Sequence, residues 1–356
     1  MPRFDLTGSS VVPVPRLNSA AETYKREIEE HFCGDLEATG CGCQAAASVR
    51  WFARRRAVHT VRPVELGRVG IWTAAFDAHP SAAAQAAAVE LEGLGYRTLW
   101  LNEATGRDPF VMAGLLLSAT STITVALGIA NIYARDAMTT AAAQKTLAEA
   151  YPDRFLLGLG VSSPVLVEKV RGHDYGKPLS YMKTYLAAMD AAPFNAVGPA
   201  APPGRILAAL GPKMLEVSAN QANGAHPYLT TADHTRWARG ILGPDVLLAP
   251  EQMVILETDV AVARAIGRSS ISFYLRAPGY LANLRRLGFS DDDWADPKAP
   301  SDRLVDAIVA YGDVATAAAR VREHLDAGAD HVAVQVLRGD REIPMAEWRE
   351  LARALL

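Results

Sequence analysis

Residues 122–164 read TITVALGIANIY, ARD, AMTTAAAQKTLAEA and YPDRFLLGLGVSSP, and this stretch decides the fold. The run 122–130 is too short for most helices and is rich in Thr, Ile and Val, which predicts a buried strand. Alanines favour a helix over 138–150, and Pro152 ends it. Residues 155–160 are apolar on both faces, as in a parallel strand that is covered on both sides. The stretch therefore predicts a strand, a helix and a second strand.

The residues that follow each of these strands are small or polar. After the second strand, a glycine and two hydroxyls precede Pro164, which suits the first position of a helix, and a helix N-terminus holds anions well. The segment is Gly160, Val161, Ser162, Ser163 and Pro164. The first strand ends in Gly128, Ile129, Ala130 and Asn131. If the unit repeats around a barrel, both segments lie on the face where active sites occur.

The same alternation of strands and helices continues from residue 67 to the C-terminus. Eight such units over about 290 residues predict an α/β protein with a (β/α)₈ TIM barrel. A helical and irregular insertion at 260–300 precedes the last strand, and whether it acts as a lid is open. An open doubly wound sheet is the alternative, but it would want a Gly-x-Gly-x-x-Gly turn after the first strand, where the sequence is GIWTAAFD. The predicted strands are 68–73, 97–102, 122–130, 155–160, 205–210, 225–229, 252–258 and 331–336, and the predicted helices include 80–95, 110–119, 138–150, 179–191, 231–242 and 344–355.

Residues 1–66 show no such alternation and predict a poorly ordered extension that the barrel domain, 67–356, can lose. All three cysteines, Cys33, Cys41 and Cys43, lie in it. Together with His31 their spacing fits no standard zinc pattern, so we expect no metal site. A main body without cysteine uses no disulfides, which favours a cytoplasmic enzyme.

The composition is that of an ordinary globular protein. Of 356 residues 50% are hydrophobic, and the formal net charge is −3. This balance argues against nucleic acid as a main partner. No apolar run approaches the roughly 20 residues of a membrane span. The sequence thus predicts an enzyme that acts on a small molecule and binds neither nucleic acid nor membrane.

Several motifs together resemble the bacterial-luciferase-like family, in particular its actinobacterial branch that uses the deazaflavin coenzyme F420. The motifs occur in order over 67–356, and each alone is weak. They are LGRVGIWTAAFD, LWLNEATGRDPF, VALGIANIYARD, YPDRFLLGLGVSS, GHDYGKPLSYMKTYLAAMD and LAALGPKMLEVSANQANGA.

The resemblance implies a coenzyme site at the C-terminal mouth of the barrel. In the family the coenzyme ring lies against a bulge in strand three that often contains a non-prolyl cis peptide. The matching cofactor-binding positions are Gly128, Ile129, Ala130 and Asn131 at the bulge, Val161, Ser162 and Ser163 after strand four, and Gly211 and Pro212 after strand five. Ala130 lacks the hydroxyl that some relatives have at this position.

The resemblance also implies two catalytic candidates. Glu103 ends strand two, where relatives have an acid or a histidine near the reacting ring carbon, and a carboxyl beside a ring and away from water would have a raised pKa that suits proton donation. The resemblance to the family also implies that His173 and Tyr175 line the mouth of the barrel. Ala104 stands where some relatives have a catalytic histidine.

Each of these residues also has a purely structural interpretation. Glu103 could cap the following helix or pair with Arg107. Ser162 and Ser163 could be an ordinary helix cap. A surface ion-pair cluster would account for Tyr133, Arg135 and Asp136, and His226 is a weaker site candidate.

The resemblance implies an F420-dependent oxidoreductase that transfers hydride between coenzyme F420 and an organic substrate. Alternatives are an FMN-dependent luciferase-like monooxygenase and a flavin-binding barrel without turnover; a phosphate-sugar isomerase is a distant third. A homodimer is expected because relatives pair through helices two and three. The apolar surface proposed for it is Phe110, Met112, Leu115 and Leu116.

Overall fold

The structure is a computed structural model that describes residues 65–356. Parallel strands follow one another in chain order from β1 to β7. The first strands are β1 (Val69–Thr73), β2 (Thr98–Leu101), β3 (Thr124–Leu127), β5 (Phe155–Gly160), β6 (Arg205–Leu207) and β7 (Gly224–Ala225). Their residues are buried almost without exception, because helices cover the outer face and side chains fill the inner one.

The strand that follows β7 closes the barrel. It is interrupted at Pro250, so that β8 (Leu247–Leu248) pairs with β7, whereas β9 (Glu251–Ile255) pairs with β11 (Val332–Val336). β11 in turn pairs with β1. Counting β8 and β9 as one strand, the order is that of a closed eight-stranded barrel, and the predicted fold is confirmed.

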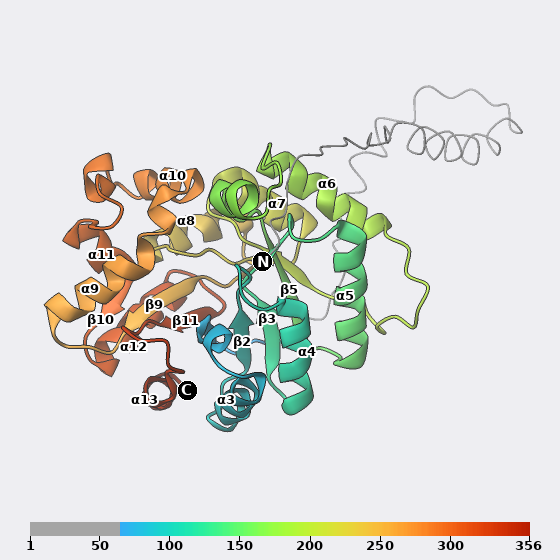
Figure 1. Ribbon diagram of the computed structural model, residues 1–356, viewed down its shortest axis with the longest axis horizontal. Helices are drawn as coiled ribbons and strands as arrows, with labels where there is room; N and C mark the ends of the chain where they lie inside the picture. Colours follow the sequence, from blue (N-terminus) through green and yellow to red (C-terminus); the bar gives the residue numbers. More distant parts are fainter. Residues whose placement is uncertain (1–64) are drawn as a thin grey trace, which may run out of the picture. The chain divides into compact units, whose positions relative to one another are not determined.

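Helices lie outside the strands, as Figure 1 shows for α3, α4 and α5 beside β2, β3 and β5. Aspartate caps start three of them: Asp108 accepts from the backbone N–H groups of Phe110 and Val111, Asp136 from that of Thr139, and Asp313 from that of Thr316. The covering helices are α3 (Ser81–Gly93), α4 (Pro109–Ala119), α5 (Ala137–Ala150), α6 (Pro178–Ala191), α7 (Pro212–Gln221), α8 (Ala232–Leu242), α12 (Val314–Asp326) and α13 (Met345–Leu355).

The inside of the barrel is filled by layers of side chains. Trp72, Trp100 and Ala126 point inward from neighbouring strands and pack with Leu156, Ile206, Ala249 and Ala333 in one buried cluster. The two tryptophans supply most of the volume, and the alanines leave room for them. The barrel is therefore a packed core, and chemistry is confined to its mouth.

The insertion before the last strand has a small core of its own. It contains α9 (Val260–Ile271), the 3₁₀ turns η4 (Tyr274–Arg276) and η5 (Asp291–Trp294), α10 (Pro278–Arg286) and α11 (Asp302–Ile308). Short strand β10 (Val309–Tyr311) returns to pair with β9. In Figure 1 these elements, in orange, gather beside β9. Residues such as Ile271, Leu275, Leu284, Trp294 and Leu304 form its core.

Three details differ from the sequence-based expectation. The third strand is not continuous: β3 ends at Leu127, and β4 (Ala130–Asn131) resumes it and pairs with β5. The fifth and sixth strands are shorter than predicted, and β8 and β10 were not predicted. All these segments are two to three residues long, which is too short to leave a periodic signal.

The surface proposed for the homodimer is wrong in three of its four residues. Phe110, Met112 and Leu116 face the sheet and are buried, because α4 packs that side onto β3 and α3. Of the four residues, only Leu115 is exposed on the surface of α4. Val111, which was not among the four, is 65% exposed. Association as a homodimer stays a prediction that these two side chains could support.

The predictions on residues 1–64, including those on the cysteines, lie outside the described residues. Among residues 65–356, no helix combines the length and apolar character that crossing a bilayer would need. The same part of the chain contains no group of three His, Cys, Asp or Glu side chains arranged to hold a metal ion.

Candidate active site

The bulge between β3 and β4 is fixed from inside the barrel. The peptide between Gly128 and Ile129 is cis. The carbonyl of Gly128 accepts a hydrogen bond from Trp72 Nε1 at 2.8 Å. A Cβ at Gly128 would lie 2.8 Å from both Trp72 Nε1 and His226 Nε2, so this position requires glycine.

The bulge lies directly against the end of the next strand. Asn131 pairs with Gly160 in the ladder, and the N–H of Ile132 donates to the carbonyl of Gly160. The side chain of Ile129 occupies the space over Gly160, where a Cβ would come within 2.5 Å of Ile129 Cδ1. The first two predicted coenzyme segments are therefore adjacent, because glycines on β5 admit the bulge.

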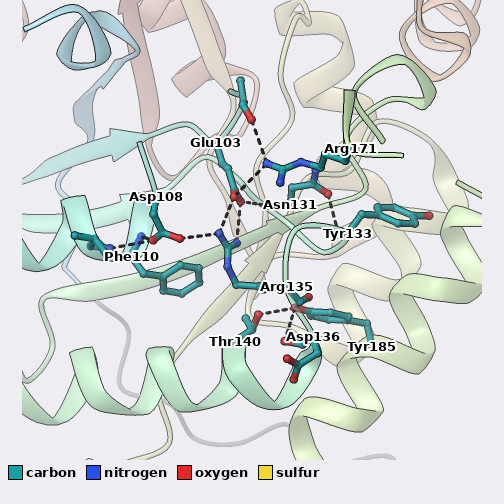
Figure 2. Close-up of polar contacts among 12 residues, drawn as sticks. Glu103, Asp108, Phe110, Asn131, Tyr133, Arg135, Asp136, Thr140, Arg171 and Tyr185 are labelled. Carbon is teal, nitrogen blue, oxygen red and sulfur yellow. Dashed lines mark hydrogen bonds and ion pairs between the residues drawn. The ribbon is translucent and has the colours of Figure 1, made fainter. Parts of the chain in front are cut away.

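Glu103 supports the bulge from the end of β2 (Figure 2). Its carboxylate accepts from Arg135 twice, Nη1 to Oε2 at 2.9 Å and Nη2 to Oε1 at 2.6 Å. The backbone N–H of Asn131 donates to Oε2 at 2.7 Å, and Arg171 Nη2 lies 3.6 Å from Oε1. Only 6% of the Glu103 side chain is exposed. A bidentate guanidinium and a backbone N–H hold the group as a carboxylate that accepts hydrogen bonds.

Neither structural alternative for Glu103 is correct. Arg107 does not reach it: its backbone N–H donates to Asp77 Oδ1 and its guanidinium to the carbonyl of His79. Asp108, not Glu103, caps α4.

The proposed surface cluster of Tyr133, Arg135 and Asp136 is also wrong. Arg135 turns inward, where its guanidinium lies 4.9 Å from the centre of the Phe110 ring. Tyr133 is buried. Asp136 caps α5. The three side chains have separate roles, and only Arg135 joins the site.

The turn after β5 is more than a helix cap. Ser162 has φ of +56°, a left-handed conformation that is unfavourable for a residue with a Cβ and that tends to occur at functional sites. Its carbonyl accepts from the Tyr175 hydroxyl at 3.4 Å. Ser163 is buried and accepts from the N–H of Leu166. The helix that follows is one π-helical turn, η3 (Val165–Val170).

The third predicted coenzyme segment lies at the start of α7. Gly211 precedes the helix and Pro212 is its first residue. A Cβ on Gly211 would be 3.9 Å from Arg286 Nη2, so a guanidinium of the insertion lies beside this helix N-terminus. The three segments thus occupy the ends of successive strands, β3 and β4, β5, and β6. His173 is not among them: its side chain is exposed in the loop after η3.

Two rows of tyrosines flank these strand ends. On one side Tyr133 stacks with Tyr175 at 5.4 Å between ring centres. On the other side the rings of Tyr228 and Tyr274 lie 5.1 Å apart, and those of Tyr274 and Tyr280 lie 5.2 Å apart. Burial, and then neighbouring charges that include the phenol of Tyr175, raise the pKa of Tyr280.

His226 lies beneath the bulge as a neutral ring. Nδ1 donates to the carbonyl of Ala249 at 2.6 Å, and the ring stacks on Trp100 with 4.4 Å between centres. Burial lowers its pKa to about 4. Within the described residues Nε2 has no hydrogen-bond partner, so it is a bare acceptor that faces Gly128.

Sequence reasoning did not identify three buried or half-buried charged residues as part of this region: Arg135, which it assigned to a surface cluster, Arg171 and Glu251. Arg135 and Arg171 follow the predicted segments by a few residues, but no local pattern shows that they turn toward Glu103. Glu251 was left outside the seventh predicted strand, 252–258, although it is 1% exposed inside the barrel. Its inward direction has a signal, because it continues the alternation of the inward-facing Leu247 and Ala249.

Curated relatives of the chain come from mycobacteria. An uncharacterized protein of Mycobacterium tuberculosis strain H37Rv is 26% identical over 319 residues, covering 75% of this chain and 94% of the relative. A second protein of that strain, whose name describes it provisionally as a coenzyme F420-dependent oxidoreductase, is 32% identical over 95 residues, or 27% of each chain.

Solved structures of similar fold include enzymes with either of two cofactors. An F420-dependent secondary alcohol dehydrogenase, in complex with an F420-acetone adduct, has a TM-score of 0.66 at 13% identity and covers 81% of this chain and 99% of its own. The oxygenating constituent of 3,6-diketocamphane monooxygenase from Pseudomonas putida, in complex with FMN, has a TM-score of 0.61 at 12% identity, with coverage of 81% and 98%. At these identities the likeness concerns the fold. The model of the luciferase-like monooxygenase family matches residues 67–331, and the chain belongs to this family.

Proposed function

We propose that the protein is an F420-dependent oxidoreductase that transfers hydride between coenzyme F420 and an organic substrate. The observation that carries the proposal is the bulge at Gly128, whose backbone is supported on both sides. Trp72 and His226 hold it from the barrel interior, and Glu103 holds it through Asn131. A flat ring needs such a rigid backbone surface.

The residues present fit a coenzyme with a planar ring and an anionic tail. Gly128, Ile129, Ala130 and Asn131 would lie against the ring. Val161, Ser162 and Ser163 would hold its neighbouring polar groups, and Gly211 and Pro212 offer a helix N-terminus to a negative charge, with Arg286 beside it. F420 would supply the hydride chemistry at its C5 carbon, and the protein would bind, orient and shield it.

Glu103 enters the proposal as the carboxylate that positions Asn131 and Arg135. Its role as an acid or base, and that of His173, stay predictions. Both oxygens of the Glu103 carboxyl accept from Arg135, and Oε2 also accepts from the N–H of Asn131, so the geometry supports the positioning role.

The FMN-dependent alternative has one observation in its favour, the fold it shares with an FMN-bound monooxygenase. The family contains enzymes of both kinds, and the bulge would suit either ring. A barrel that binds a flavin without turnover remains a third possibility. The F420 proposal is preferred for the ordered motifs GIANIYARD and GLGVSS and is supported by the name of a mycobacterial relative.

Titration of the full-length protein with F420 and with FMN, followed by fluorescence, tests the assignment. We expect F420 to bind with a Kd of about 1 μM or lower and FMN to bind much more weakly. Tight binding of FMN without a response to F420 would reverse the assignment. Tight binding of either cofactor without any turnover over a broad substrate screen would support the non-catalytic alternative.

A further inference from the structure

One polar side chain interrupts the apolar last strand of the barrel. β11 reads VAVQV, and its polar residue is Gln335. Ala333, two positions earlier, belongs to the buried cluster inside the barrel, so the alternation of a strand turns Gln335 inward as well. In the ladder Gln335 pairs with Trp72 of β1. It is half-buried and lies near the C-terminal end of its strand, which is the end that faces the mouth.

Two phenols fix the direction of the Gln335 amide. The Tyr228 hydroxyl donates to Gln335 Oε1 at 2.9 Å and lies 3.0 Å from the Tyr274 hydroxyl. Because a hydroxyl has one proton to donate, the Tyr274 hydroxyl must donate to the Tyr228 oxygen. Tyr228 follows β7, and Tyr274 is in η4 of the insertion. A chain of O–H donors therefore runs from the insertion to β11 and ends on the amide oxygen.

The amide nitrogen of Gln335 stays unused. Among residues 65–356 no group accepts from Nε2, and this nitrogen is not one of the buried polar atoms without a partner, so it is open to solvent. Gln252 on the neighbouring β9 is the opposite case. It is 1% exposed, its Nε2 donates to the carbonyl of Ile308 at 3.0 Å, and its Oε1 lies 3.0 Å from His324 Nε2. Gln252 is thus a structural amide, whereas Gln335 presents free N–H donors.

One indole separates these donors from the bulge. The rings of Tyr228 and Trp72 lie 5.4 Å apart between centres, and Trp72 Nε1 donates to the carbonyl of Gly128 at 2.8 Å. Gln335 is therefore connected to Gly128 through two side chains that are in direct contact. The free donors and the bulge belong to one continuous wall.

The surroundings of the free donors are uncharged. An indole and two phenols adjoin the amide. Arg338, three residues further along the chain, pairs with Asp340 and Glu347. On β9, burial raises the pKa of Glu251 to about 8, so that this acid is neutral near pH 7. A neutral N–H donor in such surroundings suits an uncharged oxygen, because no opposite charge is present to compensate an ion.

We propose that Gln335 is a specificity-determining residue of the substrate site and that its N–H groups bind the carbonyl oxygen of an uncharged organic substrate. The proposal rests on the function proposed above, because it places the substrate at the mouth that the coenzyme shares. Tyr228 and Tyr274 are positioning residues: they occupy the amide oxygen and leave the nitrogen for the substrate. The insertion thereby takes part in recognition through Tyr274. A substrate that offers only N–H donors finds no acceptor on this amide.

NMR on the full-length protein labelled with ¹⁵N-glutamine tests the proposal, with three probes that share a six-membered ring. Cyclohexanone should shift the side-chain N–H signals of Gln335, which Gln335→Met identifies because it removes them. Cyclohexylammonium, a donor, and cyclohexanecarboxylate, an anion, should leave these signals unchanged. The signals of Gln252 are the internal control and should respond to none of the probes, since both ends of that amide are already bonded.

Variants add a measurement of affinity, by saturation-transfer NMR on cyclohexanone. Gln335→Met should weaken binding about threefold to tenfold, which corresponds to one neutral hydrogen bond. Tyr228→Phe should shift the Gln335 signals and weaken binding less, because the donors stay but lose their fixed direction. Gln85→Met, which removes a glutamine of α3 that donates to the carbonyl of Leu115, is the matched control and should leave affinity unchanged. A purely structural role of Gln335 predicts no response of its signals to cyclohexanone.

A parallel titration with F420 separates this proposal from the function on which it rests. If F420 does not bind but the Gln335 signals respond to cyclohexanone, the proposed function fails and the donor site stands. If F420 binds but these signals ignore cyclohexanone, or respond more strongly to cyclohexanecarboxylate, the donor site is refuted and the function stands. Should Gln335→Met fail to fold, the signals that Tyr228→Phe shifts give the assignment, and the response of the wild type decides.

Discussion

Two buried glutamates of one barrel have opposite surroundings. Glu103, on the side of β2 and β4, meets a bidentate guanidinium and a backbone N–H. Glu251, in β9, has one long N–H contact and, among the described residues, an oxygen without a partner. Both are buried, at 6% exposure of the Glu103 side chain and 1% of Glu251. The comparison teaches that burial alone does not decide what a carboxyl does. Glu103, compensated by Arg135, is a fixed acceptor, whereas the uncompensated Glu251 holds a proton.

Removing the charge of Glu103, the glutamate with an ion-pair partner, should have the largest effect on stability. Glu103→Gln removes the buried, bidentate partner of Arg135, whose side chain is 13% exposed, and leaves it only the more exposed Asp108 at 3.1 Å. Loss of one partner of a buried ion pair costs about 3–5 kcal/mol, so we expect the free energy of unfolding to fall by about 3 kcal/mol in urea denaturation. The matched control is Glu90→Gln, whose exposed pair with Arg349 should contribute less than about 1 kcal/mol.

The same variant also tests the acid or base role of Glu103. That role predicts a fall in turnover of about 10²- to 10⁴-fold, with F420 affinity changed less than about tenfold and stability retained. A variant as stable as Glu90→Gln would contradict the ion-pair account. If turnover is then also unchanged, Glu103 has no part in the chemistry and His173 is the next candidate to test.

Glu251, which has no ion-pair partner among the described residues, should make the free energy of unfolding depend on pH. Burial raises the pKa of Glu251 from 4.5 to about 8, so above pH 4.5 the folded protein holds a proton that the unfolded chain releases. This contribution is fully present below pH 4.5 and is lost as the pH rises to about 8. At about 1.4 kcal/mol per pH unit, the wild type should lose about 2.5 kcal/mol relative to Glu251→Gln between pH 5.5 and 7.5.

The measurement is a series of urea denaturations across this range on both proteins. Glu90→Gln again serves as the control, because removal of its exposed carboxyl should shift stability by the same amount at every pH in the window. A constant difference between wild type and Glu251→Gln would mean that Glu251 is ionised in the folded state, and the contrast with Glu103 would disappear.

A third and smaller effect concerns the bulge that lies between the two acids. Gly128→Ala places a methyl group 2.8 Å from Trp72 Nε1 and His226 Nε2, both held by other contacts, and overpacking of this kind costs about 1–3 kcal/mol. F420 affinity should fall as well, because a bulge pushed away from Trp72 and His226 displaces the backbone surface proposed for the ring. Gly114→Ala in α4 is the control, since its Cβ would meet Leu147 at an ordinary 3.6 Å. Thermal denaturation should show the first variant less stable than wild type and the second equal to it or slightly more stable; equal melting temperatures for the two would contradict the packing argument.

The sequence determined the barrel because its signals are local. The apolar β-branched runs and alanine-rich helices of residues 122–164, repeated around the chain, specify parallel strands covered on both faces, and small residues after each strand mark the mouth. The segments at Gly128, Ser162 and Gly211 were found in this way. The end of a strand can be recognised from the sequence, and the resemblance to a family indicated the role of these segments.

Only the tertiary structure decided which charges meet. Arg135 lies 32 residues from Glu103 and reaches it because β2 and β4 end at the same level of the barrel, whereas the nearer Arg107 turns away to His79. Glu251 in β9 meets the N–H of Leu229, which follows β7, and no spacing in the sequence records that these two residues converge. The ionisation of a carboxyl depends on the dielectric and on the donors around it, and both are set by distances in space, which the order of residues does not contain.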